Sequence, residues 1–141
     1  MGRRFLSTLS VILMLGLAPS STLASTEKEA AAWQVALRWL SLVDAGDYDA
    51  SWQASSEHFK KTINGDHWHS VLTGVRQPLG KVLDRKLKSR TFATELPGAP
   101  DGEYVVIQFD TVFENKRSST EMVTPKKDSD GKWRVSGYYI K

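Results

Sequence analysis

The chain has 141 residues, of which 40% are hydrophobic and 25% charged, with 19 basic residues against 16 acidic ones and a formal net charge of +3. It contains no cysteine, which excludes disulfides, thiolate chemistry and a lipidated cysteine behind a signal peptide. Two arginines fall within the first 24 residues, and the remaining 17 basic and 16 acidic residues nearly balance, which argues against nucleic-acid binding.

Residues 1–24 have the pattern of a secretory signal peptide. Arg3 and Arg4 form a positive start, and an apolar run with small or hydroxyl residues follows over 5–18. This run covers fourteen residues, fewer than the roughly 20 that cross a bilayer as a helix, and Thr-Leu-Ala at 22–24 places small residues where signal peptidase cleaves. We therefore expect cleavage after Ala24, a periplasmic or secreted protein, and no membrane attachment of the mature chain.

The mature chain, residues 25–141, is long enough for one domain with a single core, and it begins with a long helix. This helix is predicted from about Thr26 to Val43, because apolar residues recur there at helical spacing. They cover most of the circumference, which is typical of a helix that the fold wraps around. Gly46 follows and is placed to adopt the left-handed conformation that ends helices.

Two shorter helices are predicted next. The second helix is capped by Asp47 or Asp49, breaks near Ser56 and resumes toward residue 63. The third covers about 65–77 and ends there, because Pro78 cannot continue a helix. We expect three of the five tryptophans to share one core, namely Trp33, Trp68 and Trp133.

After residue 80 the apolar period changes to two, which is typical of strands. Strands are predicted over 81–96, 104–113, 118–126 and 132–141, separated by turns rich in Pro, Gly, Asp and Asn. Helices first and strands afterwards, without alternation, predict an α+β fold. In this fold the N-terminal helices pack on one side of a curved antiparallel sheet of about four strands.

Alternation within two of these strands assigns their faces. In the second strand, the odd-numbered residues from Val105 to Phe113 are apolar apart from Thr111, and they are expected to face the core. The even-numbered residues are mixed and are expected to face outward. In the last strand, the expected core face contains Trp133, Val135, Gly137 and Tyr139, and the expected outer face contains Arg134, Ser136, Tyr138 and Ile140.

Five ordered stretches of the mature chain resemble a bacterial family called domain of unknown function 4019. They are Trp39 to Tyr48 (WLSLVDAGDY), Ser51-Trp52, Arg76 to Gly80 (RQPLG), Leu96 to Tyr104 (LPGAPDGEY) and Asp130 to Tyr138 (DGKWRVSGY). The order of helices and strands also resembles the cystatin-like, nuclear-transport-factor-2-like cone, in which a curved sheet folds around a long N-terminal helix. The family resemblance implies a small exported domain with no assigned reaction, and it supplies no catalytic residues.

The histidines are the most obvious metal candidates. If the segment containing His67 and His69 is helical, the two side chains point about 200° apart and cannot bind one ion together. No cluster of carboxylates or cysteines accompanies them or His58, so we expect no metal. The chain also lacks a nucleophile elbow, a phosphate-binding loop and a dinucleotide fingerprint, and we expect no cofactor.

Four basic residues are candidate anion contacts. Arg76 closes the third helix, where a cation meets the negative end of the helix dipole. Its structural interpretation is that it bonds terminal carbonyls or an acid of the sheet. Lys86, Lys88 and Arg90 alternate along one strand face, where lysines protect an edge strand from pairing with another chain. The alternative is contact with an anionic surface or polymer.

The inferred inward face of the sheet has few polar groups, which weakens an enzymatic interpretation. Only Thr111 and Tyr139 offer polar atoms there, whereas Asp110, Glu114 and Arg134 map to the outer face. A general base would have to come from a helix. We therefore favour a non-catalytic binding or accessory module acting through its sheet face. The alternative is a hydrolase or isomerase with a pocket between helices and sheet.

The outer face of the sheet is expected to meet a second copy of the chain or an exported protein partner. Its mixture of tyrosines, aliphatic and polar residues is too apolar for full solvation, and such patches are typical of interfaces. The alternative is that these side chains cover one another as cross-strand pairs. The candidate partner-binding residues are Tyr104, Val106, Gln108, Asp110, Arg134 and Tyr138.

Overall fold

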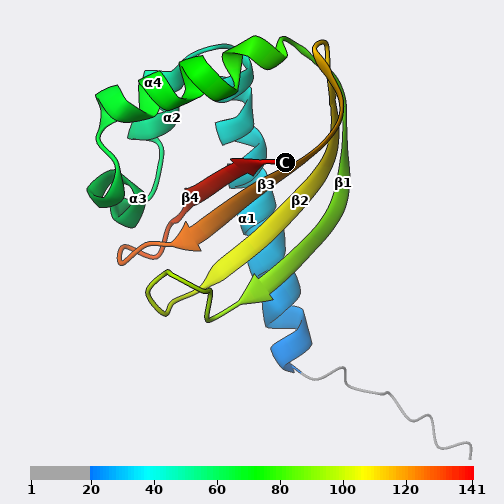
Figure 1. The fold of residues 1–141 in the computed structure, drawn as a ribbon. Coiled ribbons are helices and arrows are strands. Elements are labelled where there is room, and N and C mark those ends of the chain that lie inside the picture. The colour runs from blue at the N-terminus through cyan, green and yellow to red at the C-terminus, as the bar shows by residue number, and fades with distance from the viewer. Residues whose placement is uncertain (1–19) are drawn as a thin grey trace, which may run out of the picture.

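The computed structural model describes residues 20–141, in which helices come first and an antiparallel sheet follows (Figure 1). The helices are α1 (Ser20–Asp44), α2 (Tyr48–Gln53), α3 (Glu57–Thr62), α4 (Gly65–Val75) and the 3-10 helix η1 (Gln77–Leu79). The strands are β1 (Val82–Ala93), β2 (Tyr104–Phe113), β3 (Lys116–Lys127) and β4 (Trp133–Ile140), and they are hydrogen-bonded in the order β1-β2-β3-β4. The predicted α+β fold is confirmed. Within residues 20–141, no helix is both long and apolar enough to span a bilayer.

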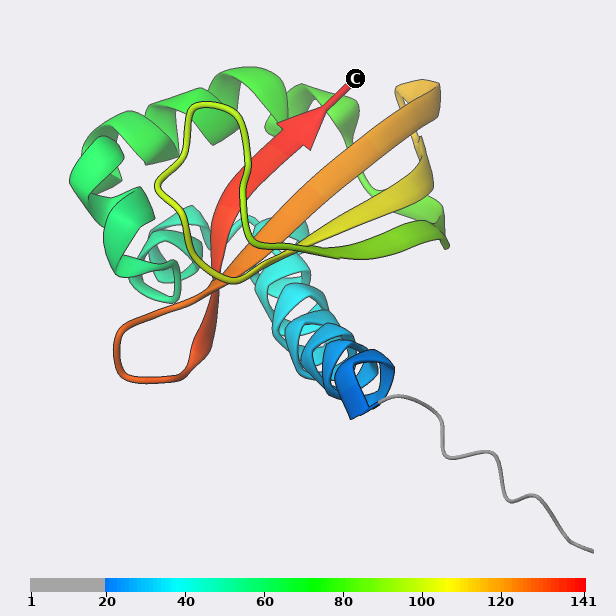
Figure 2. The same ribbon diagram turned by 90° about the horizontal axis from the view of Figure 1, so that it is seen from below.

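α1 is the element around which the others pack. The sheet curves around one side of it, and α2 to α4 lie near its C-terminal end (Figure 1, Figure 2). The small side chains of Ala32 and Ala36 are fully buried in the core that α1 shares with the sheet. α1 begins earlier than predicted, because residues 20–24 already belong to it. The rest of the expected signal peptide, 1–19, lies outside the described residues, and cleavage after Ala24 stays a prediction.

Polar residues begin each of the three shorter α-helices. The side-chain oxygens of Asp47, Ser56 and Asn64 each accept a hydrogen bond from the backbone N–H three residues further on. This confirms the predicted start of the second helix and the break at Ser56. α4 ends two residues before the predicted position. Gly46 has a φ of 77°, which confirms the left-handed turn expected after α1.

The core lies between α1, α4 and the inner face of the sheet. The predicted inward residues of β2 are all buried. Val105, Ile107 and Phe109 belong to one core cluster with Trp39 and Leu40 of α1 and Trp68 of α4. Trp68 therefore belongs to the core as expected. Trp33 and Trp133 pack against it and stay partly exposed.

A β-bulge in β4 corrects the faces expected for its C-terminal half. The pairing with β3 skips Ser136, which is an extra residue between Val135 and Gly137. The Ser136 hydroxyl is hydrogen-bonded at 2.8 Å to the serine that caps α3, so a contact with a distant segment holds the bulge. Because the extra residue reverses the alternation, Tyr138 faces the core and Tyr139 faces outward.

A bulge in β1 separates the basic residues that we expected on one face. Lys86 pairs with Asp110 of β2, Arg90 pairs with Ile107, and Lys88 lies at the bulge between them. Because Asp110 faces outward and Ile107 faces the core, Lys86 and Arg90 lie on opposite faces of the sheet. The Arg90 guanidinium lies over a tryptophan ring of α1, 5.6 Å from the ring centroid.

Candidate functional site

Glu121, on the inner face of β3, is the centre of a buried polar network. Its side chain is 0% exposed. The carboxylate accepts hydrogen bonds from Arg85 Nε at 2.8 Å, from the Thr111 hydroxyl at 2.6 Å and from the Tyr138 hydroxyl. Arg85 Nη2 adds a fourth bond at 3.2 Å. These bonds offset the cost of removing the carboxylate from water, and full burial keeps it out of reach of a substrate.

Asp44, at the C-terminal end of α1, joins this network to a second arginine. Arg85 donates to both of its oxygens, at 2.7 and 2.9 Å, and Arg76 donates to one of them at 3.2 Å. Arg76 is 3% exposed and also donates to the Gly80 carbonyl at 2.6 Å. Arg76 therefore bonds a backbone carbonyl as expected, but its carboxylate partner, Asp44, belongs to α1 and not to the sheet. Its Nε has no hydrogen-bond partner among the described residues.

Burial and hydrogen bonding set the protonation states of this network. Burial by itself lowers the pKa of Arg85, but the hydrogen bonds and charges of Asp44 and Glu121 outweigh it and hold the pKa above its ordinary value. Burial, followed by the charge of Glu121 and the hydrogen bond to it, raises the pKa of Tyr138 well above its ordinary value. Both side chains keep their protons at neutral pH and act as donors to the carboxylates.

The strand patterns of the sequence do not predict this network. Alternation puts only Thr111 and Tyr139 on the inner face as polar groups, whereas the structure adds Arg85, Glu121 and Tyr138 and turns Tyr139 outward. The position of Glu121 indicates that it is buried, because it lies two residues before Val123 in the same strand and alternation puts both side chains on one face. Arg85 and Tyr138 lie beside bulges, where simple alternation fails.

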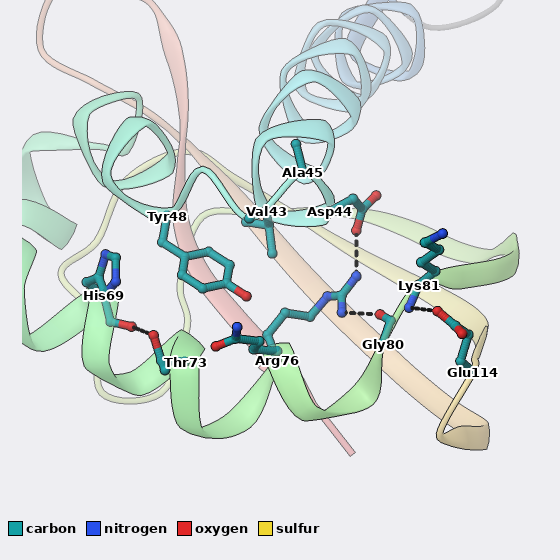
Figure 3. Close-up of a pocket in the computed structure, with 12 residues that line it drawn as sticks. Val43, Asp44, Ala45, Tyr48, His69, Thr73, Arg76, Gly80, Lys81 and Glu114 are labelled. Carbon is teal, nitrogen blue, oxygen red and sulfur yellow. Dashed lines mark hydrogen bonds and ion pairs between the residues drawn. The ribbon is translucent and has the colours of Figure 1, made fainter.

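A cavity of about 350 Å³, which we call the helix-end cavity, adjoins Asp44 and Arg76 (Figure 3). It lies where the C-terminal ends of α1 and α4 meet the start of β1. His69 and Thr73 on α4 and Arg76, which caps the C-terminal end of α4, line it from one side, since they follow each other at intervals of four and three residues. Tyr48 is 7% exposed; its hydroxyl points toward Arg76 and has no hydrogen bond among the described residues. The lining also contains Val43, Ala45, Gly80, Lys81 and Glu114.

A family model described as protein of unknown function (DUF4019) matches residues 35–138. The chain belongs to this family. The match extends from the middle of α1 into β4, which confirms the family resemblance seen in the sequence, whereas the cystatin-like cone stays a prediction. A search of curated proteins found no match. The matched range contains the whole buried network, namely Asp44, Arg76, Arg85, Thr111, Glu121 and Tyr138.

Only part of the expected partner-binding set of this DUF4019 chain is accessible on the outer face. Asp110 is exposed, and Val106 and Gln108 are partly exposed. Tyr104 is buried. Its hydroxyl donates to a backbone carbonyl of the β1–β2 loop, and a lysine ammonium lies 5.6 Å from its ring centroid. Tyr138 faces the core, as described above. Tyr104 and Tyr138 therefore do not belong to the accessible surface.

Arg134 faces outward, but its guanidinium is engaged within the turn between β3 and β4. It donates to Asp128 at 2.8 Å and to both oxygens of Asp130, at 3.0 and 2.8 Å. The bonds from Arg134 and from the Lys132 backbone N–H lower the pKa of Asp130 to about 2. The structure assigns Arg134 a role in holding this turn.

The remaining candidate anion contacts differ in their surroundings. Lys86 and Lys88 lie 3.7 and 4.0 Å from Asp84 and Asp110 at the surface, where ion pairs contribute little free energy. The Arg90 guanidinium lies over the Trp33 ring of α1. Of the four candidates, only Arg76 lines the helix-end cavity.

Two of the three histidines, His67 and His69, lie on α4, and His58 lies on α3. His67 and His69 are both helical and two residues apart, which is the arrangement that prevents them from sharing an ion. His69 Nδ1 lies 2.9 Å from an Asp49 carboxylate oxygen instead. Among residues 20–141, no three His, Cys, Asp or Glu side chains are grouped to hold a metal ion. The expectation of no metal stays a prediction.

An apolar groove of about 230 Å³ lies between α4 and β4. Val75 and Tyr139, which are 52% and 61% exposed, line it from α4 and from β4. Tyr139 pairs with Met122 of β3, and Met122 pairs with Gln108 of β2, so these three residues form a row across the outer face next to the groove. We call the combined area the Tyr139 surface; it consists of Val71, Val75, Gln108, Met122, Tyr139 and Ile140.

Proposed function

We propose that this DUF4019 chain is a non-catalytic binding module that docks another exported protein on the Tyr139 surface. The observation on which the proposal rests is the exposure of two large apolar side chains, Val75 and Tyr139, in one groove. Covering such side chains removes apolar area from water, which is the main favourable term in protein association. Tyrosine is also among the residues that dominate the free energy of binding at interfaces.

The edge of β4 supports the same proposal. β4 is hydrogen-bonded to β3 on one side and forms one edge of the described sheet. On its other side, Val135 is bridged by Ser55 and accepts a hydrogen bond from Ser56. Beyond Ser136, an extended segment of a partner can pair with the free backbone edge while its side chains enter the groove.

The state of the acidic residues favours binding over catalysis. A general base must reach its substrate. Glu121 is completely buried and bonded by three side chains, and Asp110 is exposed on the outer face with a lysine ammonium 4.0 Å away. A substrate cannot reach the buried Glu121 carboxylate, and Asp110 lies at the surface, where water has access to it.

A small-molecule enzyme is the second candidate, supported by the helix-end cavity. His69 lines this cavity and is paired with Asp49, an arrangement that can orient an imidazole as a base. The two side chains are 51% and 77% exposed, so water competes for their hydrogen bonds. We therefore rank this function second.

Export is part of the proposal and is supported by the signal-peptide pattern of residues 1–24. The partner is then another exported protein. Crosslinking in the cell that produces the protein identifies the partner. The purified partner is then titrated against the purified chain. A partner that binds with a saturable isotherm supports the proposal; self-association alone in sedimentation velocity contradicts docking of a different protein.

Paired charge substitutions test the surface. Val75→Glu with Tyr139→Lys places charges in the groove, and we expect it to weaken partner binding by about 100-fold or more, because interface anchors each contribute on the order of 2 kcal/mol. The matched control is Leu83→Glu with Leu87→Lys, because these two residues are also exposed and apolar but lie on β1. Equal binding by both variants would place the interface elsewhere.

A further inference from the structure

The backbone of β4 alternates between bonding β3 and facing the free edge of the sheet. Thr120 and Lys141 exchange both of their backbone hydrogen bonds, at 3.0 and 2.9 Å, and so form a hydrogen-bonded pair. In an antiparallel ladder such pairs alternate with pairs whose N–H and C=O groups point away from each other. The register therefore turns the backbone groups of Tyr139 toward β3 and those of Tyr138 and Ile140 toward the edge.

These edge groups have no partner in the part of the chain that the structure describes. Among residues 20–141, the backbone N–H and C=O groups of Tyr138 and Ile140 form no hydrogen bond. The same edge pairs with an extended segment where the chain supplies one, because Ser56 donates its backbone N–H to the Val135 carbonyl at 2.8 Å. That pairing ends at the bulge, and the edge over 137–140, about 14 Å long, is open.

The groove beside this open edge is uncharged. None of the side chains that line it carries a charge, and α4 supplies four apolar ones, namely Trp68, Val71, Leu72 and Val75. A charged group that entered the groove would lose its hydration without gaining an ion pair. The groove therefore selects apolar side chains from whatever lies along the edge.

We propose that the partner presents an extended segment that joins the sheet as a fifth strand beside β4, with apolar side chains at the alternate positions that face α4. This inference rests on the proposed docking at the Tyr139 surface and specifies the kind of partner. A strand has free N–H and C=O groups to pair with those of Tyr138 and Ile140, whereas a helix uses its own backbone groups internally. The intervening side chains of the segment lie on the outer face beside Tyr139, where polar residues are tolerated.

Amide hydrogen exchange of the ¹⁵N-labelled chain, followed by NMR, tests the open edge before any partner is added. We expect the amides of Tyr138 and Ile140 to exchange at least tenfold faster than the amide of Tyr139, which is bonded to β3. Slow exchange at Tyr138 and Ile140 in the free chain would overturn the inference, because the edge would then already be covered.

The same measurement on the complex with the purified, crosslink-identified partner tests the added strand. We expect exchange at Tyr138 and Ile140 to slow by at least tenfold, while exchange at Tyr139 stays unchanged. Binding that is weakened by Val75→Glu with Tyr139→Lys but leaves both edge amides unprotected would show docking through side chains alone. That result overturns this inference and leaves the proposed function standing, whereas the absence of any binding partner overturns both.

Two variants of Ile140 separate the backbone bond from the side chain. Ile140→Pro removes the N–H that points to the edge and keeps the pairing with β3, while Ile140→Ala shortens the side chain and keeps the N–H. We expect Ile140→Pro to raise the Kd for the partner about tenfold relative to Ile140→Ala. Equal Kd values in two folded variants would contradict backbone pairing. If circular dichroism shows that Ile140→Pro does not fold, the exchange measurement on the wild-type complex decides.

Discussion

Glu121 connects all four strands of the described sheet. Its carboxylate on β3 is bonded by Arg85 from β1, Thr111 from β2 and Tyr138 from β4. Through Arg85 the network continues to Asp44 at the end of α1. One buried carboxylate thus links all four strands to one another and, through Arg85, to the central helix. Its role is to hold the fold together.

Removing Arg85 tests this role. Arg85→Ala leaves Glu121 buried without its charged partner and removes the two hydrogen bonds that Arg85 donates to Asp44. We therefore expect the free energy of unfolding to fall by about 3–5 kcal/mol. Urea denaturation followed by tryptophan fluorescence measures it. The control replaces both charges, Arg85→Met with Glu121→Leu, and should be more stable than Arg85→Ala alone, because no unpaired charge is then buried. A loss below about 1 kcal/mol in the single variant would show that the network contributes little.

At the scale of single elements, the β3–β4 hairpin shows how a local turn and a tertiary contact share control of a strand. The turn over residues 128–131 was predicted from its Asp and Gly residues, and Gly131 has the positive φ that such a turn requires. Arg134 holds this turn through two carboxylates. Two residues after Arg134, the bulge at Ser136 reverses the faces of β4, and the turn itself does not determine this bulge.

The pKa of Asp130 reports on this turn. Its pKa is lowered from 3.8 to about 2, chiefly by the hydrogen bonds from Arg134. Because the folded-state pKa lies below the unfolded one, the contribution of Asp130 to stability is present above pH 3.8 and is lost as the pH falls toward 2. NMR titration of the side-chain carboxyl should give a pKa near 2 in the wild type. It should return toward 3.8 in Arg134→Ala; a wild-type value already near 3.8 would contradict the bidentate pair.

At the scale of the whole molecule, the distance between α1 and the sheet determines the core. Small buried residues of α1 allow the curved sheet to wrap closely around the helix (Figure 1). Cores are packed at the density of organic crystals, so a change in this spacing is transmitted to both layers. The Tyr139 surface and the helix-end cavity lie on separate parts of this scaffold.

Ala36 tests the spacing between helix and sheet. Ala36→Leu keeps a strong helix former but inserts a larger side chain at a fully buried position, and we expect a loss of about 1–3 kcal/mol by overpacking. The control is Leu37→Ala at the neighbouring position, which is exposed, and its loss should stay below about 1 kcal/mol. Differential scanning calorimetry measures both. An unchanged midpoint for Ala36→Leu would show that α1 has free space against the sheet.

The sequence by itself determined the α+β class, the starts of the second and third predicted helices, the core face of β2 and the family. Each of these depends on residues that are close in the chain, such as Asp47 and its backbone donor or the alternation within β2. Only the tertiary structure decided the bulges at Lys88 and Ser136, the faces of Arg90 and Tyr138, and the partners of Glu121. The physical reason is that a bulge and a buried ion pair are stabilised by distant segments, as in the bond from Ser56 to Ser136 across eighty residues, and no local pattern encodes such a contact.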